Sequence, residues 1–389
     1  MQRGPQGRLV RRKAGPEPYD AFVPAALPPV PALEWTPELQ DLAERANRAL
    51  GRLDGVSALL PDRALFLYMY VRKEAVLSSQ IEGTQSSFSE LLLFENAQSP
   101  GVPTEDVMEV SRYVAAMTLG LERLRGGFPL SSRLLREIHG RLMATGRGSD
   151  RTPGEFRRSQ NWIGGTRPGD AVYVPPPEQE VTRRMGELEL FLHDAGSRTP
   201  TLVKAALAHV QLETIHPFLD GNGRLGRLLI TFLLCAENAI AEPLLYLSLY
   251  LKQNRSAYYD LLQRVRLEGD WEAWLRFFLE GIEATAQQAS ATAGRIVRLL
   301  EADRARIGGI GRAAGSALQV HDLLRRRVYV SIRSATAELS LTRPTIAAAI
   351  AALEQLGIVR ETTGRGRGRI YAYSEYLRIL DEGTEPIRP

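Results

Sequence analysis

The segment ETIHPFLDGNGRLGR, residues 213–227, constrains the fold of this chain more than any other segment. A helical pattern ends near Ile215, a loop broken by glycines follows, and a second helical pattern begins near Arg224. Glycine lets a backbone turn through conformations that other residues avoid. The segment therefore predicts two helices that are joined by a tight loop.

Such a loop is suited to binding an anion. N–H groups at the start of a helix have no partner within the helix, and the helix dipole adds positive potential there. Gly221, Asn222 and Gly223 would supply these N–H groups. Arg224 and Arg227 are three residues apart, so they share one face of the second helix and suit forked contacts with phosphate oxygens.

Two more side chains indicate which anion would bind and which reaction it would undergo. Asp220 at the mouth of the loop would repel phosphates unless a cation lay between them, and Mg²⁺ is commonly held by one carboxylate plus substrate phosphates. His216 has an ordinary pKa that suits a general base near neutral pH. The alternative is a plain turn between helices, with these side chains capping carbonyls or pairing with acids. Their co-occurrence in one short span favours a polyphosphate site beside a base.

Most of residues 36–300 has the pattern of one helical body. PDRALFLYMYVRKEAVLSSQIEG, residues 61–83, predicts a long helix with Pro61 and Asp62 near its start and Gly83 after its end. Its spacing places Glu74, Ser78 and Glu82 on one stripe.

Further helices are predicted in PTEDVMEVSRYVAAMTLGLERL, SSRLLREIHGRLM, EQEVTRRMGELELFLHDA and TPTLVKAALAHVQLETI. In the last of these, Thr199 is expected as the N-cap and Pro200 as the first helical residue. QNWIGG and AVYV, within residues 157–180, predict a strand, a turn and a strand. Residues 1–35 contain seven prolines, which favours an extended arm without a core of its own.

The last seventy residues differ in character from the helical body. Glycines between residues 308 and 315 mark a joint. SIRSATAELSLTRPTIAAAIAALEQLGIV predicts two helices around a short turn, and RETTGRGRGRIYAY predicts two short strands around a tip. This order is typical of a winged helix-turn-helix module. The arginines that would contact DNA are Arg343 at the start of the second helix and Arg365, Arg367 and Arg369 at the tip.

Composition indicates a globular protein in the cytoplasm. The chain of 389 residues is 44 % hydrophobic and 24 % charged, with a net charge of +4. No stretch approaches twenty uncharged apolar residues, and the N-terminus lacks the pattern of a signal peptide. The single cysteine, Cys235, lies in an apolar run and is expected to be buried.

The motif HPFLDGNGRLGR resembles the signature of the Fic family, with every fixed position present from His216 to Arg227. GEFRRSQNWIG and VYVPPPEQEV are similar to the segments around the family's β-hairpin flap, and NRSAYYDLLQRVRLEGDWEAWLRFFL to the helices that complete its nucleotide pocket. YDAFVPAALPP and EAVLSSQIEGTQSS are similar to the N-terminal region of its bacterial members. The resemblance covers roughly residues 19–282 and implies a mainly α Fic-fold bundle with a flap, beside the winged helix.

The resemblance implies transfer of AMP from ATP, with Mg²⁺, to a Ser, Thr or Tyr hydroxyl of a target protein. It assigns His216 as the base and Asp220 as the metal ligand. The residue 221–223 loop would hold the phosphates, Arg224 the β-phosphate side and Arg227 the γ-phosphate. It also assigns Tyr173 and Val174 in the flap to flank nucleotide and target, and Tyr258 and Tyr259 to lie near the adenine. For the tyrosines, plain helix packing is the alternative.

A second motif of the resemblance implies self-inhibition. Self-inhibited Fic proteins carry a Ser or Thr, then a Glu four residues later, then Gly or Asn, and Ser78, Glu82 and Gly83 match this pattern. Glu82 would pair with Arg227 and take the place of the γ-phosphate. In some relatives the same glutamate helps water to remove AMP from the target, and some relatives dimerise to secure the inhibitory helix. The alternative is a solvated glutamate at an exposed helix end.

We therefore predict four parts: an N-terminal region with the inhibitory motif (1–100), a Fic core (101–285), a linker helix and joint (286–320) and a winged helix (321–380). Two other functions stay open. The first is a DNA-binding regulator with a nucleotide-sensing body. The second is a Fic transferase that uses another nucleotide.

Overall fold

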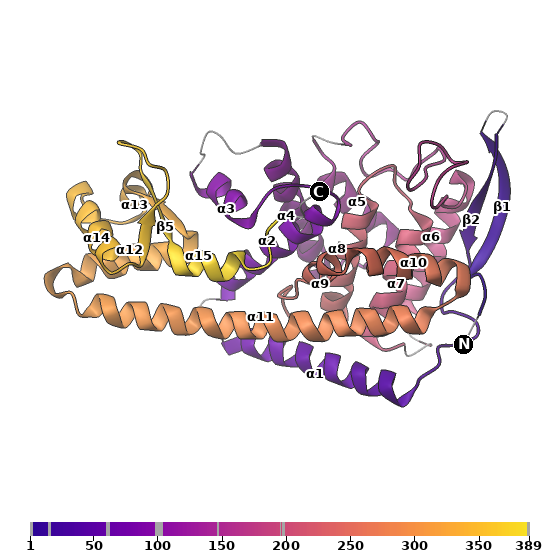
Figure 1. Ribbon diagram of the computed structural model, residues 1–389, viewed down its shortest axis with the longest axis horizontal. Coiled ribbons are helices and arrows are strands. Elements are labelled where there is room, and N and C mark those ends of the chain that lie inside the picture. The colour runs from indigo at the N-terminus through magenta and orange to yellow at the C-terminus, as the bar shows by residue number, and fades with distance from the viewer. Residues whose placement is uncertain are drawn as a thin grey trace.

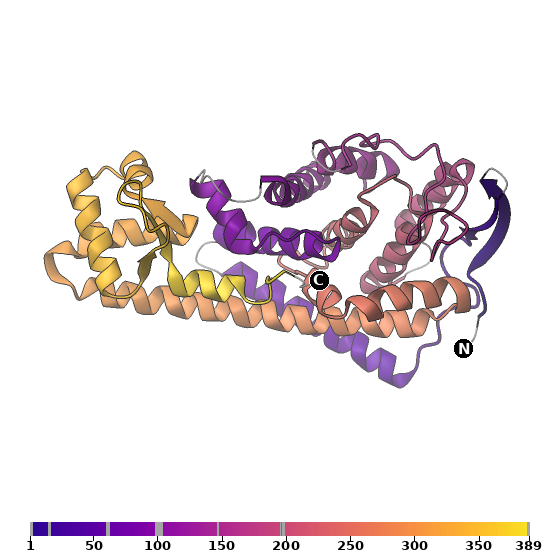
Figure 2. The same cartoon turned by 45° about the horizontal axis from the view of Figure 1, so that its top comes forward.

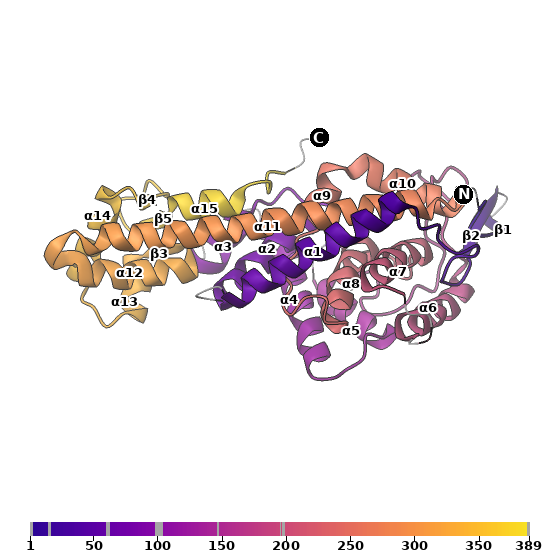
Figure 3. The ribbon, with the colours of Figure 1, turned by 90° about the horizontal axis from the view of Figure 1, so that it is seen from below.

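The structure is a computed structural model that describes residues 3–14, 17–59, 63–97, 104–145, 148–194, 196 and 199–386. It is mainly helical, as the sequence predicts. Helix α11 (Trp271–Gly308) runs along most of the molecule, with the C-terminal module at one end and the N-terminal hairpin at the other (Figure 1). Helix α1 (Pro37–Leu59) packs along α11 (Figure 3). Among the described residues, no helix is both long enough and apolar enough to cross a bilayer.

Helices α7 (Thr201–Ile215) and α8 (Asn222–Ala236) form the centre of the helical body. Nearly every residue of both helices is buried, because other helices surround them. These helices are α2 (Arg63–Ile81), α4 (Thr104–Arg125), α5 (Ser132–Leu142), α6 (Glu178–His193) and α10 (Arg255–Glu268), with α3 (Phe88–Ala97) and α9 (Ser248–Gln253) at the edge. The loop between α7 and α8 is therefore held rigidly from both sides.

Two predicted helix ends can be compared with the structure. Helix α7 begins one residue later than expected, since Pro200 is its N-cap and Thr201 its first residue. Gly83 follows the end of α2 with φ of 98°, as expected of a residue that closes a helix. Pro61 and Asp62 lie outside the described residues.

The prediction for the N-terminal arm was wrong. Residues 7–24 form an antiparallel hairpin of β1 (Gly7–Ala14) and β2 (Glu17–Pro24). One end of β2 is buried, and Phe22 and Val23 are almost fully covered. The proline content suggested an arm without a core, but this segment buries apolar side chains against the flap and α7.

The predicted strands of the flap are also absent as strands. Residues 158–177 form a loop in which a single bridge joins Ile163 to Tyr173, with N to O distances of 2.8 and 3.1 Å, and Glu178 begins α6. The next residue pairs elsewhere, because the Phe22 N–H donates to the Val174 carbonyl at 2.9 Å. Strand β2 therefore supports the second arm of the flap from outside.

The C-terminal module has the predicted order of elements. Helices α12 (Ala314–Arg327), α13 (Ile332–Glu338) and α14 (Arg343–Gln355) pack on a sheet with the order β3 (Tyr329–Ser331), β5 (Ile370–Tyr373), β4 (Val359–Glu361). A short 3-10 helix, η1 (Gly311–Ala313), forms the joint after α11. The proposed boundary at 285/286 falls inside α11, which continues without a break.

The segment after α15 (Ser374–Asp381) returns to the helical body and contacts α2 (Figure 2). The Lys73 ammonium donates to the carbonyls of Leu380 at 3.1 Å and Glu382 at 2.7 Å. The Gln80 amide donates to the Thr384 carbonyl at 2.7 Å. Helix α2 thus contacts the C-terminal segment through two buried side chains.

Candidate functional site

The loop between α7 and α8 has the tight turn that its glycines predict. His216 caps α7 in the left-handed conformation (φ 49°), and Gly221 precedes α8 with φ of 78°. The Asn222 side chain closes the loop, accepting from the Phe218 N–H and donating to the Phe218 carbonyl, both at 2.9 Å. Asn222 therefore braces the turn with its side chain, and the first N–H groups of α8 are left to face a ligand.

His216 is held by its backbone and keeps a neutral ring. Arg157, which precedes the flap, donates from Nε to the His216 carbonyl at 2.9 Å. Burial, together with the charges of Arg157 and Arg266, lowers the pKa of His216 to about 3. The Nδ1 atom has no hydrogen-bond partner among the described residues. The ring is thus unprotonated at neutral pH, as a general base must be.

His139 on α5 supports the same loop, although sequence reasoning gave it no role. Its ring stacks on Phe218 with centroids 3.8 Å apart. The Gly154 N–H donates to Nδ1 at 2.9 Å, so Nε2 carries the proton and donates to the Asp220 carbonyl at 2.9 Å. Burial lowers the pKa of His139 to about 4. A neutral histidine therefore fixes the backbone of Asp220.

The Asp220 side chain lies at the mouth of the loop and is 38 % exposed. One oxygen accepts from the Gly221 N–H at 2.6 Å. No group of three or more His, Cys, Asp or Glu side chains that could hold a metal ion occurs in the residues that the structure describes. A single accessible carboxylate suits Mg²⁺ when substrate phosphates and water supply the other ligands.

The two arginines of α8 are both buried and both paired with acids. Arg224 contacts Glu109 of α4 with Nη1 to Oε1 of 2.7 Å. Arg227 contacts Glu82 with Nη2 to Oε1 of 2.6 Å and donates from Nε to the Ser78 hydroxyl at 2.8 Å. The structure thus places Ser78 and Glu82 beside Arg227, which follows them in the chain by nearly 150 residues.

Glu82 is ionised in this pair. Burial alone would raise the pKa of Glu82, but the charge of Arg227 and the hydrogen bond from it outweigh burial and lower the pKa. Gly223 makes room for the carboxylate, because a Cβ atom at Gly223 would lie 2.3 Å from Glu82 Oε1. The ion pair therefore lies directly over the first turn of α8.

The four aromatic and flap residues lie in two different environments. Tyr173 and Val174 are buried: the Tyr173 hydroxyl donates to the Thr214 carbonyl at 2.7 Å, and Val174 packs on the hairpin. Tyr258 is buried as well, with its hydroxyl 2.8 Å from His209 Nε2. Tyr259 is 38 % exposed. Of these four, only Tyr259 presents much surface to a ligand, and the contacts of the other three are with the protein.

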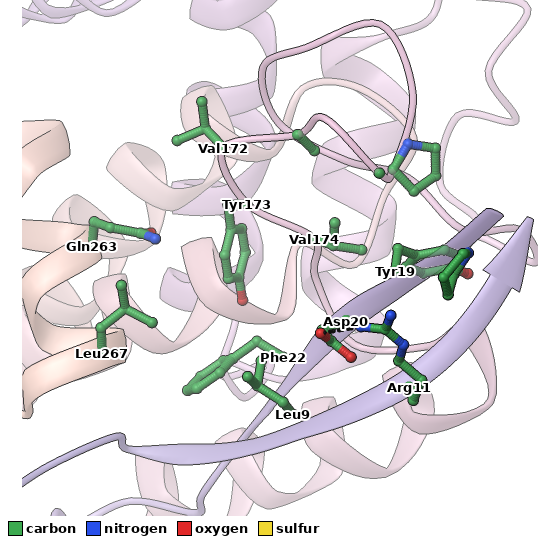
Figure 4. Close-up of a pocket in the computed structure, with 14 residues that line it drawn as sticks. Leu9, Arg11, Tyr19, Asp20, Phe22, Val172, Tyr173, Val174, Gln263 and Leu267 are labelled. Atoms are coloured by element: carbon green, nitrogen blue, oxygen red, sulfur yellow. Dashed lines mark hydrogen bonds and ion pairs between the residues drawn. The ribbon is translucent and has the colours of Figure 1, made fainter.

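A groove lies beside the flap (Figure 4), and His216 is not among the residues that line it. It is formed by the N-terminal hairpin, the flap and α10, with Leu9, Val172 and Leu267 as exposed apolar side chains. Tyr173 separates the groove from α7. The groove lies where the hairpin packs against the flap. None of the charged residues of the loop between α7 and α8 lines it.

The arginines predicted to contact DNA are exposed in the C-terminal module. Arg343 is the first residue of α14, and Arg365, Arg367 and Arg369 lie in the loop between β4 and β5. The exposed residues of α14 are otherwise Pro344, Ala348, Ala351, Glu354 and Gln355. DNA binding by this face stays a prediction.

Comparisons with known proteins agree with this arrangement. The sequence matches the family models described as Fic/DOC family N-terminal over residues 40–122 and Fic/DOC family over residues 129–234. A protein of Aedes aegypti named protein adenylyltransferase Fic is 39 % identical over 150 residues, which are 38 % of this chain and 27 % of that protein. The protein of the same name from Drosophila melanogaster is 37 % identical over the same shares. The matched segment spans about a quarter of the length of these curated relatives.

Two solved structures have a similar fold. A Fic family protein from Desulfovibrio desulfuricans has a TM-score of 0.58 and 21 % identity, over 88 % of this chain and 97 % of that chain. A Fic domain containing signaling protein from Bacteroides thetaiotaomicron has a TM-score of 0.50 and 17 % identity, over 64 % of this chain and 95 % of that chain. At this level of identity the likeness shows the fold alone.

Proposed function

Since the chain belongs to the Fic/DOC family, we propose that it is a protein adenylyltransferase that is restrained by its own helix α2. The observation that carries this proposal is the ion pair of Glu82, whose side chain is 34 % exposed, with the buried Arg227, beside the neutral ring of His216. The relatives named protein adenylyltransferase support the reaction type.

In the proposed reaction, the hydroxyl oxygen of a Ser, Thr or Tyr side chain attacks the α-phosphorus of ATP. The bond from that phosphorus to the bridging oxygen breaks, pyrophosphate leaves, and the unprotonated ring of His216 takes the hydroxyl proton. The N–H groups at the start of α8 bind phosphate oxygens, and Arg224 and Arg227 offset the charge that develops on the leaving group. Asp220 would hold Mg²⁺, which would add positive charge beside the phosphates.

Glu82 is the proposed inhibitor. Arg227 donates to Glu82 and to Ser78 through two of its nitrogens, so a γ-phosphate has to displace a carboxylate to reach it. A carboxylate beside the phosphates also repels them. ATP then binds in a pose in which the α-phosphorus is not aligned for attack. We further propose that Glu82 can direct a water molecule in the reverse reaction, removal of AMP from the target.

The test is label transfer from ATP labelled at the α-phosphate, with Mg²⁺, to the full chain and to proteins of a lysate. We expect Glu82→Gly to increase transfer strongly over the wild type, because Arg227 becomes available to the γ-phosphate. Adding His216→Ala should reduce transfer by roughly 10²-fold or more, the usual contribution of a positioned base. Melting temperatures of both variants control for folding.

A folded Glu82→Gly variant that transfers no label from ATP contradicts the adenylyltransferase proposal. Repeating the assay with labelled GTP, CTP and UTP then separates a different nucleotide from no transfer at all.

A further inference from the structure

Arg224 and Arg227 are satisfied to different extents. Arg227 uses Nε and Nη2 for three hydrogen bonds with Ser78 and Glu82. Arg224 has one close partner, Glu109. Its Nη2 lies 3.3 Å from the Met143 sulfur, a weak acceptor, and 3.7 Å from Asp220 Oδ1, which is beyond hydrogen-bond distance. The Arg224 Nε is buried without a hydrogen-bond partner among the described residues. An unpaired donor on a buried, charged group is costly, so this edge of Arg224 is suited to an anionic ligand.

Glu109 is the residue that holds the other edge of Arg224. It lies on α4, outside the loop, and is 7 % exposed. Its Oε1 accepts from Arg224 Nη1 at 2.7 Å and from the Thr84 hydroxyl at 3.0 Å. Thr84 itself is buried and follows the turn that contains Glu82 and Gly83. The carboxylate is therefore held from a second side, by a residue outside α8.

The guanidinium group is planar and rigid, so a fixed contact at one edge orients the opposite edge. With Nη1 held by Glu109, the plane of Arg224 is set before a nucleotide arrives. A preorganised donor binds more tightly than a mobile one, because less conformational entropy is lost on binding.

We propose that Glu109 is a positioning residue of this site, which holds Arg224 so that its free edge meets the β-phosphate group of the nucleotide. This inference rests on the proposed function. It separates the two acids: Glu82 competes with the nucleotide for Arg227, whereas Glu109 prepares Arg224 for it.

The test compares binding of ADP and AMP, both with Mg²⁺, to the full chain carrying Glu82→Gly, by calorimetry. AMP lacks the β-phosphate, so loss of a positioned Arg224 should weaken ADP and spare AMP. Adding Glu109→Ala is expected to weaken ADP roughly tenfold, and AMP by less than about twofold, from the usual strength of a hydrogen bond to a charged group. Glu109→Gln keeps an acceptor and the volume, so it should restore part of the loss. Glu105→Ala, at an exposed acid one turn earlier on α4, is the control and should change neither.

A double-mutant cycle with Arg224→Ala distinguishes positioning from general damage. Once Arg224 is removed, Glu109→Ala should no longer change the ratio of ADP to AMP affinity. Equal weakening of ADP and AMP by both Glu109 variants overturns the inference, and so does an ADP effect that persists without Arg224. If Glu109→Ala does not fold, the ratio in Glu109→Gln decides. If the folded Glu82→Gly variant binds neither nucleotide, the proposed function fails, and this inference fails with it.

Discussion

Ser78 and Ser79 are adjacent on α2, and both side chains are completely buried. Their hydroxyl groups nevertheless differ in environment. The Ser78 oxygen accepts from Arg227 Nε at 2.8 Å, whereas the Ser79 oxygen has no hydrogen-bond partner among the described residues. Two serines of equal burial therefore provide a matched pair for measuring what one hydrogen bond to Arg227 contributes.

We predict that Ser78→Ala weakens the restraint on Arg227 and Ser79→Ala does not. Loss of the Ser78 bond removes roughly 1.5–3 kcal/mol from the inhibited state, as is usual for a hydrogen bond to a charged group. Label transfer from α-labelled ATP should rise about tenfold or more with Ser78→Ala, and less than with Glu82→Gly. Equal transfer by the two serine variants would show that the hydroxyl of Ser78 does not contribute.

The residues of the site were predictable where they are close in sequence. His216, Asp220 and Arg227 lie within a span of twelve residues, so the sequence alone predicts that they act at one site. Glu109, Arg157 and His139 were missed, because each reaches the loop from a different element and has no local signal beyond ordinary helical or loop composition. Asn222 was assigned to the phosphates, but its side chain closes the loop, a distinction that depends on hydrogen bonds within the turn.

At the scale of elements, the N-terminal hairpin and the flap form one structure. Strand β2 lies beside the second flap arm, and the Phe22 N–H to Val174 carbonyl bond joins them. Helix lengths and the loop at residue 216 followed from hydrophobic periodicity and glycines. The hairpin did not, because its burial comes from contacts with segments about 150 and 190 residues away, and its prolines and basic residues resemble those of a disordered arm.

We predict that Phe22→Ala makes the flap more mobile. The Phe22 side chain is 3 % exposed, and truncating a buried phenylalanine typically destabilises a protein by about 3–5 kcal/mol. Amide hydrogen exchange at Ile163 and Tyr173 should accelerate, since their bridge loses the support of β2. Leu9→Ala, at an exposed position on β1, is the control. Unchanged exchange at both amides would mean that the flap holds its bridge without the hairpin.

At the scale of the whole molecule, α2 connects parts that are distant in sequence. The chain has four lysines among its many arginines, and one of them, Lys73, is buried against the C-terminal segment. Burial lowers the pKa of Lys73 to about 8, while Glu382 and Asp381 favour its charged form. Two backbone carbonyls near the C-terminus thus accept hydrogen bonds from one ammonium group, that of Lys73 on α2.

We predict that Lys73→Met lowers the melting temperature and exposes residues 380–386 to protease. The substitution keeps most of the apolar stem but leaves the carbonyls of Leu380 and Glu382 without their donor, at a cost of about 1–3 kcal/mol. Lys13→Met, at an exposed residue of β1, should change neither property. Limited proteolysis followed by mass spectrometry locates the cleavage. An unaltered cleavage pattern would show that the remaining contacts hold the segment.

Helix α2 meets Arg227 through Ser78 at the same time as it meets the C-terminal segment through Lys73 and Gln80. These three positions lie within eight residues of one helix. A shift of α2 that frees Arg227 would therefore also change the hydrogen bonds that Lys73 and Gln80 make with the C-terminal segment. When two binding events are coupled through one helix, each changes the affinity of the other by the same factor. If a partner of the C-terminal module moved the segment and thereby made nucleotide binding tenfold tighter, nucleotide would make that partner bind tenfold tighter as well.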